Sequence, residues 1–328
     1  MVKGNSFWKE RKVLVTGATG LVGAWLVKDL CARGATVVGL IQDQNPQSEL
    51  YRSGDIQRII VVNGELENFR DCERVINQNE IDTVFHLGAQ TIVGTAQRDP
   101  FSTWESNIRG TYNLLEACRL HKNLVKRILV ASSDKAYGTK HKLPYTEDMP
   151  LEGKFPYEVS KTCTDLLAQA YVHSYGLPVT IVRCGNIFGG GDLNWSRIVP
   201  GTIRSFLNKE APIIRSDGKF VRDYVYVKDI SRAYIELAEN LVEKNLAGEA
   251  FNVSGEAPLR VLDVVAAVQD VMDCKNIKPK ILNSASGEIH SQYLSSGKIQ
   301  KLLKWKPQLK LKDALAETVR WYRDYLSK

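Results

Sequence analysis

The sequence lacks the features that mark membrane-spanning and exported proteins. None of its apolar runs reaches the roughly 18 to 20 residues that a transmembrane helix requires. The amino-terminal stretch MVKGNSFWKERK lacks the apolar segment of a signal peptide. The chain also has no tract rich in proline and glycine and no tract of a single charge, so we expect no disorder beyond the first residues. These absences predict a soluble, cytoplasmic protein with no membrane partner.

Cysteine and histidine are few and scattered, which excludes the familiar metal-binding motifs. No CxxC pair occurs, and the cysteines and histidines form no metal-ligand pattern. The sequence therefore predicts reduced core thiols, no metal and no catalytic histidine. The residues concerned are Cys31, Cys72, Cys118, Cys163, Cys184 and Cys274, and His86, His121, His141, His173 and His290.

A net charge of +7 is compatible with nucleic-acid binding. The lysines are dispersed, however, and the sequence contains no basic patch interleaved with aromatic residues. We therefore expect no nucleic-acid partner, and a small anionic ligand fits the charge better. The densest group of lysines is interpreted as part of a solvated helix and loop surface. It consists of Lys298, Lys301, Lys304, Lys306, Lys310 and Lys312.

Short β-branched runs alternate with helical patterns through the first half of the chain. Continuous apolar strands between helices predict a parallel sheet covered on both faces. The expected strands are KVLVTG (12–17), ATVVGLI (35–41), TVFHLGA (83–89), RILVAS (127–132) and PVTIVRCG (178–185). The expected helices cover 21–33, 67–79, 102–121 and 157–174.

The pattern changes after Gly185, where 186–222 is rich in Gly, Asn, Asp and Arg. A chain of 328 residues, 44% of them hydrophobic, exceeds the size of one ordinary core. We predict an α/β fold, with a doubly wound parallel sheet of the Rossmann type and a smaller mixed C-terminal lobe. The sheet domain would comprise 1–186 and be re-entered at 223–255. The lobe, 187–328, would close a ligand-binding crevice over the carboxyl ends of the strands.

Three glycines follow the first strand in VTGATGLVGAWLV. Gly17, Gly20 and Gly23 stand where a strand turns into a helix, so backbone amides there can approach a pyrophosphate. A second strand about twenty residues later completes the pattern of a dinucleotide-binding unit. An acid at its tip binds the ribose 2′-hydroxyl of NAD, whereas an arginine suits NADP. Asp43 is the candidate acid, and its presence predicts NAD as the cofactor. The alternative interpretation of Asp43 is a solvated loop carboxylate without a binding role.

A tyrosine and a lysine lie four residues apart in PYEVSKTC. On a helix Tyr157 and Lys161 share one face. A free tyrosine has a pKa of about 10, and a neighbouring ammonium favours its phenolate form. The spacing recurs at Tyr224 and Lys228, which we interpret as structural because a strand would hold them ~13 Å apart. Only Tyr157 follows a strand ending in Ser-Ser, so this pair predicts a proton-transfer site, with a helix-surface pair as the alternative.

Several motifs together resemble the extended short-chain dehydrogenase/reductase superfamily, which contains nucleotide-sugar epimerases and dehydratases. They are the glycine triplet, SS before the Tyr and Lys, ESNIRGT, RCGNIFGGGD and RDYVYVKD. The resemblance covers nearly the whole chain. It implies a catalytic triad of Ser133, Tyr157 and Lys161, an NAD cofactor, a nucleotide-sugar substrate and a homodimer formed through paired helices.

The resemblance also implies binding residues for both ligands. Arg183, Asn186 and Arg222 would lie near the nucleotide diphosphate. The sequence departs from the family at Glu65, where Asp is common, and at Gly88, where Ala is usual. Cofactor contacts are expected from Gly17, Thr19, Gly20, Leu21, Val22, Gly23, Asp43, Glu65, Leu66, Leu87, Gly88, Ala89, Tyr157 and Lys161. Substrate contacts are expected from Gln90, Asn107, Ser133, Asn186, Arg197, Arg222 and Tyr293.

An acid and a base stand side by side in SSDKAYG. Simple 4-epimerases of the superfamily commonly carry small residues at the positions of Asp134 and Lys135, whereas 4,6-dehydratases of the CDP-glucose type resemble this chain. Such an enzyme makes a 4-ketone, which acidifies C5, and then removes water across C5 and C6. Asp134 would protonate the departing 6-hydroxyl, and Lys135 would act as the base or stabilise the enolate. The resemblance therefore implies an NAD-dependent nucleotide-sugar 4,6-dehydratase that yields a 4-keto-6-deoxy sugar.

Other functions stay open on the same residues. A 4-epimerase or a 5,6-dehydratase would use the same scaffold, and an NAD-binding regulatory protein without turnover is a candidate of another class. The presence of Ser133, Tyr157 and Lys161 argues against the regulatory protein, because a binding module has no need of proton-transfer groups. The Asp-Lys pair itself has a surface ion pair as its alternative interpretation.

Overall fold

The computed structural model describes residues 7–284 and 289–327. Within these ranges a seven-stranded sheet runs in the order β10-β6-β5-β4-β1-β2-β3, and all neighbouring strands are parallel. This confirms the predicted doubly wound α/β fold. The strand β3 was not predicted, because it is a four-residue edge strand with mostly exposed side chains. The strands are β1 (Lys12–Thr16), β2 (Thr36–Ile41), β3 (Ile60–Asn63), β4 (Thr83–His86), β5 (Arg127–Ala131), β6 (Val179–Cys184) and β10 (Ala250–Val253).

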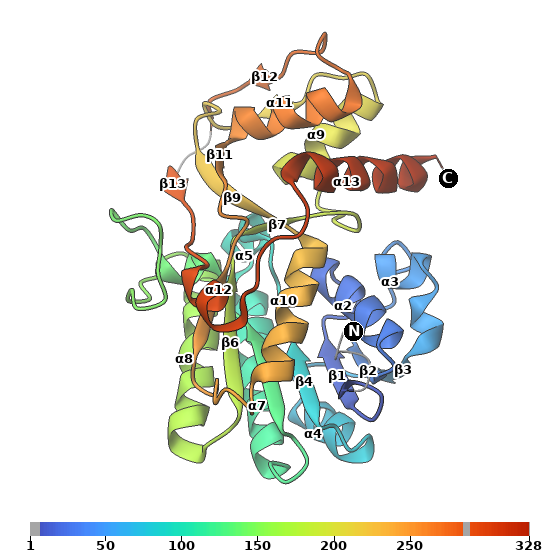
Figure 1. The fold of residues 1–328 in the computed structure, drawn as a ribbon, viewed down its shortest axis with the longest axis vertical. Coiled ribbons are helices and arrows are strands. Elements are labelled where there is room, and N and C mark those ends of the chain that lie inside the picture. The colour runs from blue at the N-terminus through green and yellow to red at the C-terminus, as the bar shows by residue number, and fades with distance from the viewer. Residues whose placement is uncertain (1–6, 285–288, 328) are drawn as a thin grey trace.

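Helices cover both faces of this sheet (Figure 1). On one face lie α2 (Leu21–Ala32) and α10 (Val227–Asn240), and on the other α4 (Phe69–Gln78), α7 (Gly110–Leu120) and α8 (Pro156–Tyr175). The three central residues of β1, Val13 to Val15, are all apolar, and their packing shows the reason. Val13 and Val15 join the core beneath α2 and α10, whereas Leu14 joins the core beneath α4 and α7. Successive side chains of a strand point to opposite faces, so the central part of a strand covered on both faces reads as a continuous apolar run.

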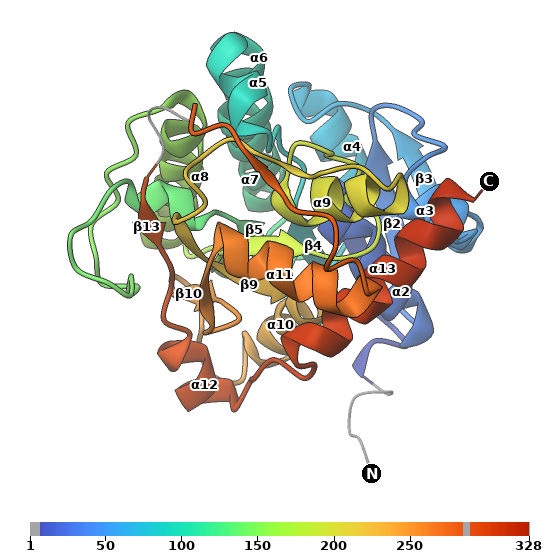
Figure 2. The same cartoon turned by 90° about the horizontal axis from the view of Figure 1, so that it is seen from above.

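A smaller lobe lies over the carboxyl ends of the strands, and Figure 2 shows its helices from above. Its sheet is built on β9, which pairs with β7, β11 and β13. The lobe strands are β7 (Asn186–Phe188), β8 (Ile213–Ile214), β9 (Val221–Tyr226), β11 (Pro258–Arg260), β12 (Lys280–Ile281) and β13 (Ser291–Gln292). The lobe helices α9 (Ile198–Leu207), α11 (Val261–Met272) and α13 (Leu311–Leu326) share one apolar core.

Short elements connect these parts. The predicted helix over 102–121 is divided by a π-helical turn, η2, which separates α6 from α7. No helix in the described ranges combines the length and the apolar character needed to cross a membrane. The remaining elements are α3 (Glu49–Arg52), η1 (Asp55–Arg58), α5 (Val93–Arg98), α6 (Pro100–Trp104), η2 (Glu105–Arg109), η3 (Asp134–Tyr137) and α12 (Gly297–Leu303).

The chain returns to the large sheet after it has built part of the lobe. Helix α10 packs against α2, and β10 pairs with β6 at the edge of the sheet. Strand β9, which precedes them, belongs to the lobe sheet. We keep the division of the chain as a proposal: 1–186 with the segment that returns within 223–255 forms a cofactor domain, and 187–328 supplies the substrate lobe.

A buried ion pair joins β6 to α8. The Nε and Nη2 of Arg183 donate to the two carboxylate oxygens of Asp165 at 2.8 and 2.9 Å, and Nη1 donates to the Tyr137 hydroxyl at 2.8 Å. Arg183 is 3% exposed and Asp165 is 0% exposed. The expectation that Arg183 lies near the nucleotide diphosphate is therefore wrong, because its guanidinium is satisfied by a carboxylate inside the fold.

We predict that Arg183→Met lowers the free energy of unfolding by about 3 to 5 kcal/mol, because the Asp165 carboxylate is left buried without its partner. The double variant Arg183→Met, Asp165→Leu removes both charges and should regain most of that loss. Urea denaturation followed by circular dichroism measures both effects. Equal destabilisation of the single and double variants would contradict this account of the pair.

Candidate active site

A cleft of about 1260 Å³ opens where the carboxyl ends of the large sheet meet the smaller lobe. Pockets for one small ligand usually measure about 300 to 1,000 Å³, so this cleft has room for a dinucleotide and a second ligand. Most residues predicted from the sequence line it. They are Gly17, Thr19, Gly20, Leu21, Val22, Gly23, Asp43, Leu66, Leu87, Gly88, Ala89, Gln90, Ser133, Asp134, Lys135, Tyr157, Lys161, Asn186, Arg197 and Arg222.

The turn from β1 to α2 requires glycine. Gly17 has a φ of +70°, and a Cβ on it would lie 2.7 Å from the backbone nitrogen of Gly88. A Cβ on Gly23 would lie 2.1 Å from the carbonyl oxygen of Gly17. Position 88 is less restricted, since a Cβ there would lie 2.6 Å from Cδ1 of Leu66, the end of a side chain that can move. Helix α2 can therefore begin directly at the tip of β1, and its first N–H groups, which lack partners within the helix, fit the diphosphate of a dinucleotide.

The loops after β2 and β3 supply the next part of the cleft wall. Asp43 lies two residues beyond β2, is exposed and lines the cleft, where a carboxylate can accept hydrogen bonds from a ribose. Glu65 is outside the cleft lining within the described part of the chain, and its backbone N–H donates to the Asp71 carboxylate at 3.2 Å. Its neighbours Gly64 and Leu66 line the cleft instead. The structure thus fits a dinucleotide, with Leu66 rather than Glu65 at the wall.

The predicted triad comes together at the end of β5 and the start of α8. Lys161 donates from Nζ to the carbonyl oxygen of Ala131 at 2.8 Å, and burial lowers the pKa of Lys161 to about 8. Burial raises the pKa of Tyr157 to about 12, while a hydrogen bond with Ser133 acts in the opposite direction. Ser133, Tyr157 and Lys161 are thus all buried in the wall of the cleft, and Tyr157 and Lys161 lie one helical turn apart on α8.

Asp134 and Lys135 begin the 3₁₀ turn η3 directly after Ser133. Ser133 Oγ donates to Asp134 Oδ1 at 3.0 Å, and Lys135 Nζ lies 3.5 Å from Asp134 Oδ2. Both side chains line the cleft, and Asp134 is 4% exposed, so this is no surface ion pair. Lys135 also donates to the side-chain carbonyl of Gln292, whose Nε2 donates to the backbone oxygen of Asp134 at 2.9 Å.

Gln292 was not predicted from the sequence. It lies in β13 of the lobe, is fully buried and holds both members of the acid-base pair. Nothing in the spacing connects a residue near the end of the chain with η3. The resemblance to the dehydrogenase superfamily indicated the adjacent Tyr293, which is outside the cleft lining among the described residues.

Asp223 is a second residue that the sequence analysis missed. It is 0% exposed, and among the described residues its Oδ1 has no hydrogen-bond partner. A Cβ on Gly185 would lie 2.4 Å from this oxygen, so glycine makes room for the carboxyl group. Burial and then the negative charge of Asp134 raise the pKa of Asp223 to about 7. Among the described residues Asp223 is outside the cleft lining, so it is a buried carboxyl group behind the cleft wall, between the lining residues Arg222 and Tyr224.

The predicted substrate residues divide into two groups. Gln90, Asn186, Arg197 and Arg222 line the cleft. Asn107 is 1% exposed and is not part of the wall that the described residues form. Its amide instead binds the backbone of Gln90. Asn107 Oδ1 accepts a hydrogen bond from Gln90 N at 2.7 Å, and Asn107 Nδ2 donates one to Gln90 O at 3.0 Å. Asn107 thus shapes the cleft through Gln90.

A hydroxyl network beneath the glycine turn includes His86. Thr16 Oγ1 accepts hydrogen bonds from the backbone N–H groups of Leu87 and Gly88 at 3.1 and 3.0 Å, so its own proton is available to His86 Nδ1 at 2.9 Å. His86 Nε2 then donates to Thr111 Oγ1 at 3.0 Å. Burial lowers the pKa of His86 to about 3, so the ring stays neutral and fixes the turn.

The second Tyr-Lys pair is not a proton-transfer site. Tyr224 lies in β9 and lines the cleft, but the strand ends before Lys228. Lys228 lies in the first turn of α10 and donates to Glu317 Oε2 at 2.6 Å. The extended run predicted over both residues is therefore too long, and Lys228 is part of a lobe contact.

Comparisons with known proteins agree with this geometry. The model of the NAD-dependent epimerase/dehydratase family matches residues 13–254. The chain is 28% identical to the CDP-glucose 4,6-dehydratase of Salmonella typhimurium, over 98% of this chain and 93% of the relative. It is similar to the solved structure of UDP-glucose 4-epimerase from Thermotoga maritima with UDP-glucose, with a TM-score of 0.86 and 26% identity over 96% of this chain and 99% of that one. It is also similar to DesIV, a dTDP-glucose 4,6-dehydratase from Streptomyces venezuelae solved with NAD, with a TM-score of 0.85 and 27% identity over 95% and 97% of the two chains.

The buried Lys161 gives a prediction that does not depend on substrate. In protein with isotope-labelled lysine, one ε-ammonium should titrate near pH 8 instead of 10.5, and this signal should be absent from Lys161→Met. The unfolded chain keeps this proton up to about pH 10.5, so wild type should gain stability relative to Lys161→Met as the pH rises from 8 to 10.5. A lysine spectrum in which every signal titrates above pH 10 would contradict the burial argument.

Proposed function

The chain belongs to the NAD-dependent epimerase/dehydratase family, and within it we propose that it is a nucleotide-sugar 4,6-dehydratase. It would convert a nucleoside diphosphate hexose, with CDP-glucose as the favoured type, to the 4-keto-6-deoxy sugar. The observation that carries this proposal is the Asp134–Lys135 pair in the cleft beside Ser133. A 4-epimerase moves hydrogens only at C4, whereas loss of water across C5 and C6 needs an additional acid and base.

The cofactor side of the cleft would hold NAD. When bound, NAD accepts a hydride from C4 of the sugar and returns it to C6. The backbone at Gly17, Gly20 and Gly23 would hold the diphosphate at the start of α2. Asp43 would bind the ribose hydroxyls, and its negative charge disfavours the 2′-phosphate of NADP.

Ser133, Tyr157 and Lys161 would remove the proton of the 4-hydroxyl. A pKa of about 12 keeps the isolated Tyr157 phenol protonated near neutral pH. The Ser133 hydrogen bond lowers this pKa, and a protonated Lys161 on the same helix face stabilises the phenolate. Lys161 has a pKa of about 8, so it carries its positive charge at neutral pH.

Asp134, Lys135 and Asp223 would carry out the loss of water. Lys135, whose Nζ lies 3.5 Å from Asp134 Oδ2, would take the proton from C5 as the base, with stabilisation of the resulting enolate as the alternative role. Asp134 would protonate the departing 6-hydroxyl, which leaves as water. Asp223, a buried carboxyl group outside the cleft lining whose pKa is raised to about 7, would return a proton to Asp134.

The substrate diphosphate would lie against Arg197 and Arg222. Arg197 donates to Asp192 Oδ2 at 3.1 Å, and Arg222 donates to the backbone oxygens of Val221 and His290 at 2.9 and 3.0 Å, so both guanidinium groups are oriented at the cleft. A guanidinium can hold phosphate oxygens in pairs.

We also propose a homodimer. Helices α7 and α8 pack beside each other and carry exposed large apolar side chains, among them Tyr112 and Leu120 on α7 and Leu166 and Tyr175 on α8. Apolar side chains exposed on paired helices are typical of an interface between copies.

Product analysis tests the proposed activity. The purified protein is incubated with NAD and separately with CDP-, dTDP-, UDP- and GDP-glucose, and the sugars are identified by NMR. A 4-keto-6-deoxy sugar from one of them supports the proposal. A C4 epimer would identify the 4-epimerase, which the similarity to the Thermotoga enzyme favours as the second candidate. No conversion of any sugar, with NAD still bound, would favour a binding protein.

Within this function, Lys135→Ala should stop the reaction after oxidation at C4. Tyr157 is unchanged in the variant, so the 4-keto sugar that keeps its 6-hydroxyl should form and persist, while formation of 6-deoxy product should fall at least a hundredfold. Mass spectrometry of quenched reactions in deuterium oxide measures the intermediate, the product and deuterium entry at C5.

Lys142→Ala is the matched control, because Lys142 is an exposed lysine of the loop after η3 and does not line the cleft. It should keep the wild-type rate. If Lys135→Ala dehydrates the sugar as fast as this control, the role assigned to Lys135 is wrong.

A further inference from the structure

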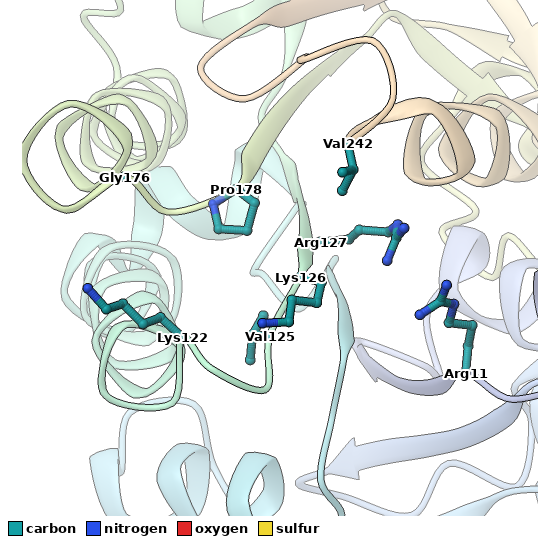
Figure 3. A pocket seen from close by; sticks show the side chains of 8 residues that line it. All are labelled: Arg11, Lys122, Val125, Lys126, Arg127, Gly176, Pro178 and Val242. Carbon is teal, nitrogen blue, oxygen red and sulfur yellow. The ribbon is translucent and has the colours of Figure 1, made fainter.

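A second pocket lies at the end of the large sheet opposite to the cleft, where the strands begin (Figure 3). It has a volume of about 410 Å³ and lies between the start of β5, the loop before β6, the residue before β1 and the end of α10. The pocket and the cleft lie at opposite ends of the sheet, because parallel strands all begin at one end and all finish at the other.

Arg127, the first residue of β5, is buried in this pocket without a polar partner for its Nε. It is 8% exposed, and among the described residues the Nε makes no hydrogen bond. The nearby Asp82 carboxylate accepts hydrogen bonds from Lys12 N at 2.8 Å and Thr83 Oγ1 at 2.6 Å, and among the described residues it forms no salt bridge with Arg127. A buried guanidinium with an unsatisfied N–H is costly, and a bound anion would supply the acceptor that this N–H lacks.

Three further cations line the same pocket. They are Arg11, Lys122 and Lys126, and the residues described there include no carboxylate. Arg11 and Arg127 lie against one ring, with their guanidinium carbons 4.8 and 5.0 Å from the centroid of Phe7. Figure 3 shows the ends of these two side chains turned toward each other. Within the described ranges, none of the four cations forms a salt bridge.

This arrangement is electrostatically unfavourable as it stands. Burial lowers the pKa of Arg127, and the positive charge of Arg11 lowers it further. The acidic groups that face Arg127 and oppose this effect are Asp82 and Glu243. Glu243 is exposed, so its charge is screened by water.

We propose that this pocket is a binding site for a small anion that carries a phosphate or diphosphate group. The forked guanidinium groups of Arg11 and Arg127 match phosphate oxygens. Figure 3 shows the ends of Lys122 and Lys126 turned away from these two arginines, so the two guanidinium groups carry the preference for a multiply charged anion over a single carboxylate. The volume of about 410 Å³ suits a small molecule, and the site is independent of the proposed dehydratase activity.

Pyrophosphate is the probe for binding in solution. Its affinity is measured by calorimetry, with NAD present at saturation, for wild type and for Arg11→Gln, Lys126→Gln. The double variant should lose at least tenfold in affinity for one site, because each charged hydrogen bond contributes about 1.5 to 3 kcal/mol. The control Lys301→Gln, Lys312→Gln removes the same charge from exposed positions elsewhere and should bind as wild type does. Equal affinity in the two double variants would overturn the proposal.

Arg127→Met separates an anion site from a structural role. If the guanidinium serves a bound anion, the variant should have the same or a higher melting temperature than wild type without pyrophosphate, and the rise caused by pyrophosphate should be smaller. A large fall in melting temperature without pyrophosphate, with the pyrophosphate-induced rise unchanged, would show that Arg127 is structural. Crystals soaked in tungstate should show an oxyanion beside Arg11 and Arg127, and a pocket without one would also overturn the proposal.

Discussion

The parallel sheet, covered by helices on both faces, constrains every other feature of this protein. Its strands are mostly apolar toward both faces, so polar groups gather mainly at the two ends of the sheet where the strands begin and end. The carboxyl edge holds the cleft, and the turn at Gly17 allows α2 to start there without a side chain in the way. The His86 and Thr16 network holds that turn from below, which ties the cofactor side of the cleft to the sheet itself.

Burial of its titratable groups gives the cleft its chemistry. Loss of water contact is the largest cause of the pKa changes at Tyr157, Lys161 and Asp223. The changes differ in direction because burial disfavours whichever form is charged, so the lysine becomes easier to deprotonate and the two acids become harder to ionise. Gln292 from the lobe fixes Asp134 and Lys135 relative to this group, so the acid-base pair depends on the lobe being in place.

Strand β5 runs from the second pocket to the cleft. Its first residue, Arg127, lies in the second pocket, which is proposed to bind an anion. Its last residue is Ala131, and Ser133, two positions further along the chain, lies in the cleft. Both ends of the sheet collect positive charge, but in different settings. In the cleft the cations have partners, as in the pair of Lys135 with Asp134, whereas Arg127 has its Nε unsatisfied within the described part of the chain. This contrast is why the second pocket needs an external anion to balance it.

The sequence by itself determined the features that depend on neighbouring residues. The glycine turn requires residues three apart at a strand-helix junction, and Tyr157 and Lys161 need only one helical turn to share a face, so both could be identified from local spacing. The parallel sheet followed from the alternation of apolar runs with helical patterns for the same reason. Only tertiary structure decided which distant groups meet. Arg183 faces Asp165 rather than the cleft, Gln292 reaches η3 from the lobe, and the charge of Asp134 acts on the buried Asp223. A strand's two faces and the docking of a second lobe are set by long-range packing that no local spacing records.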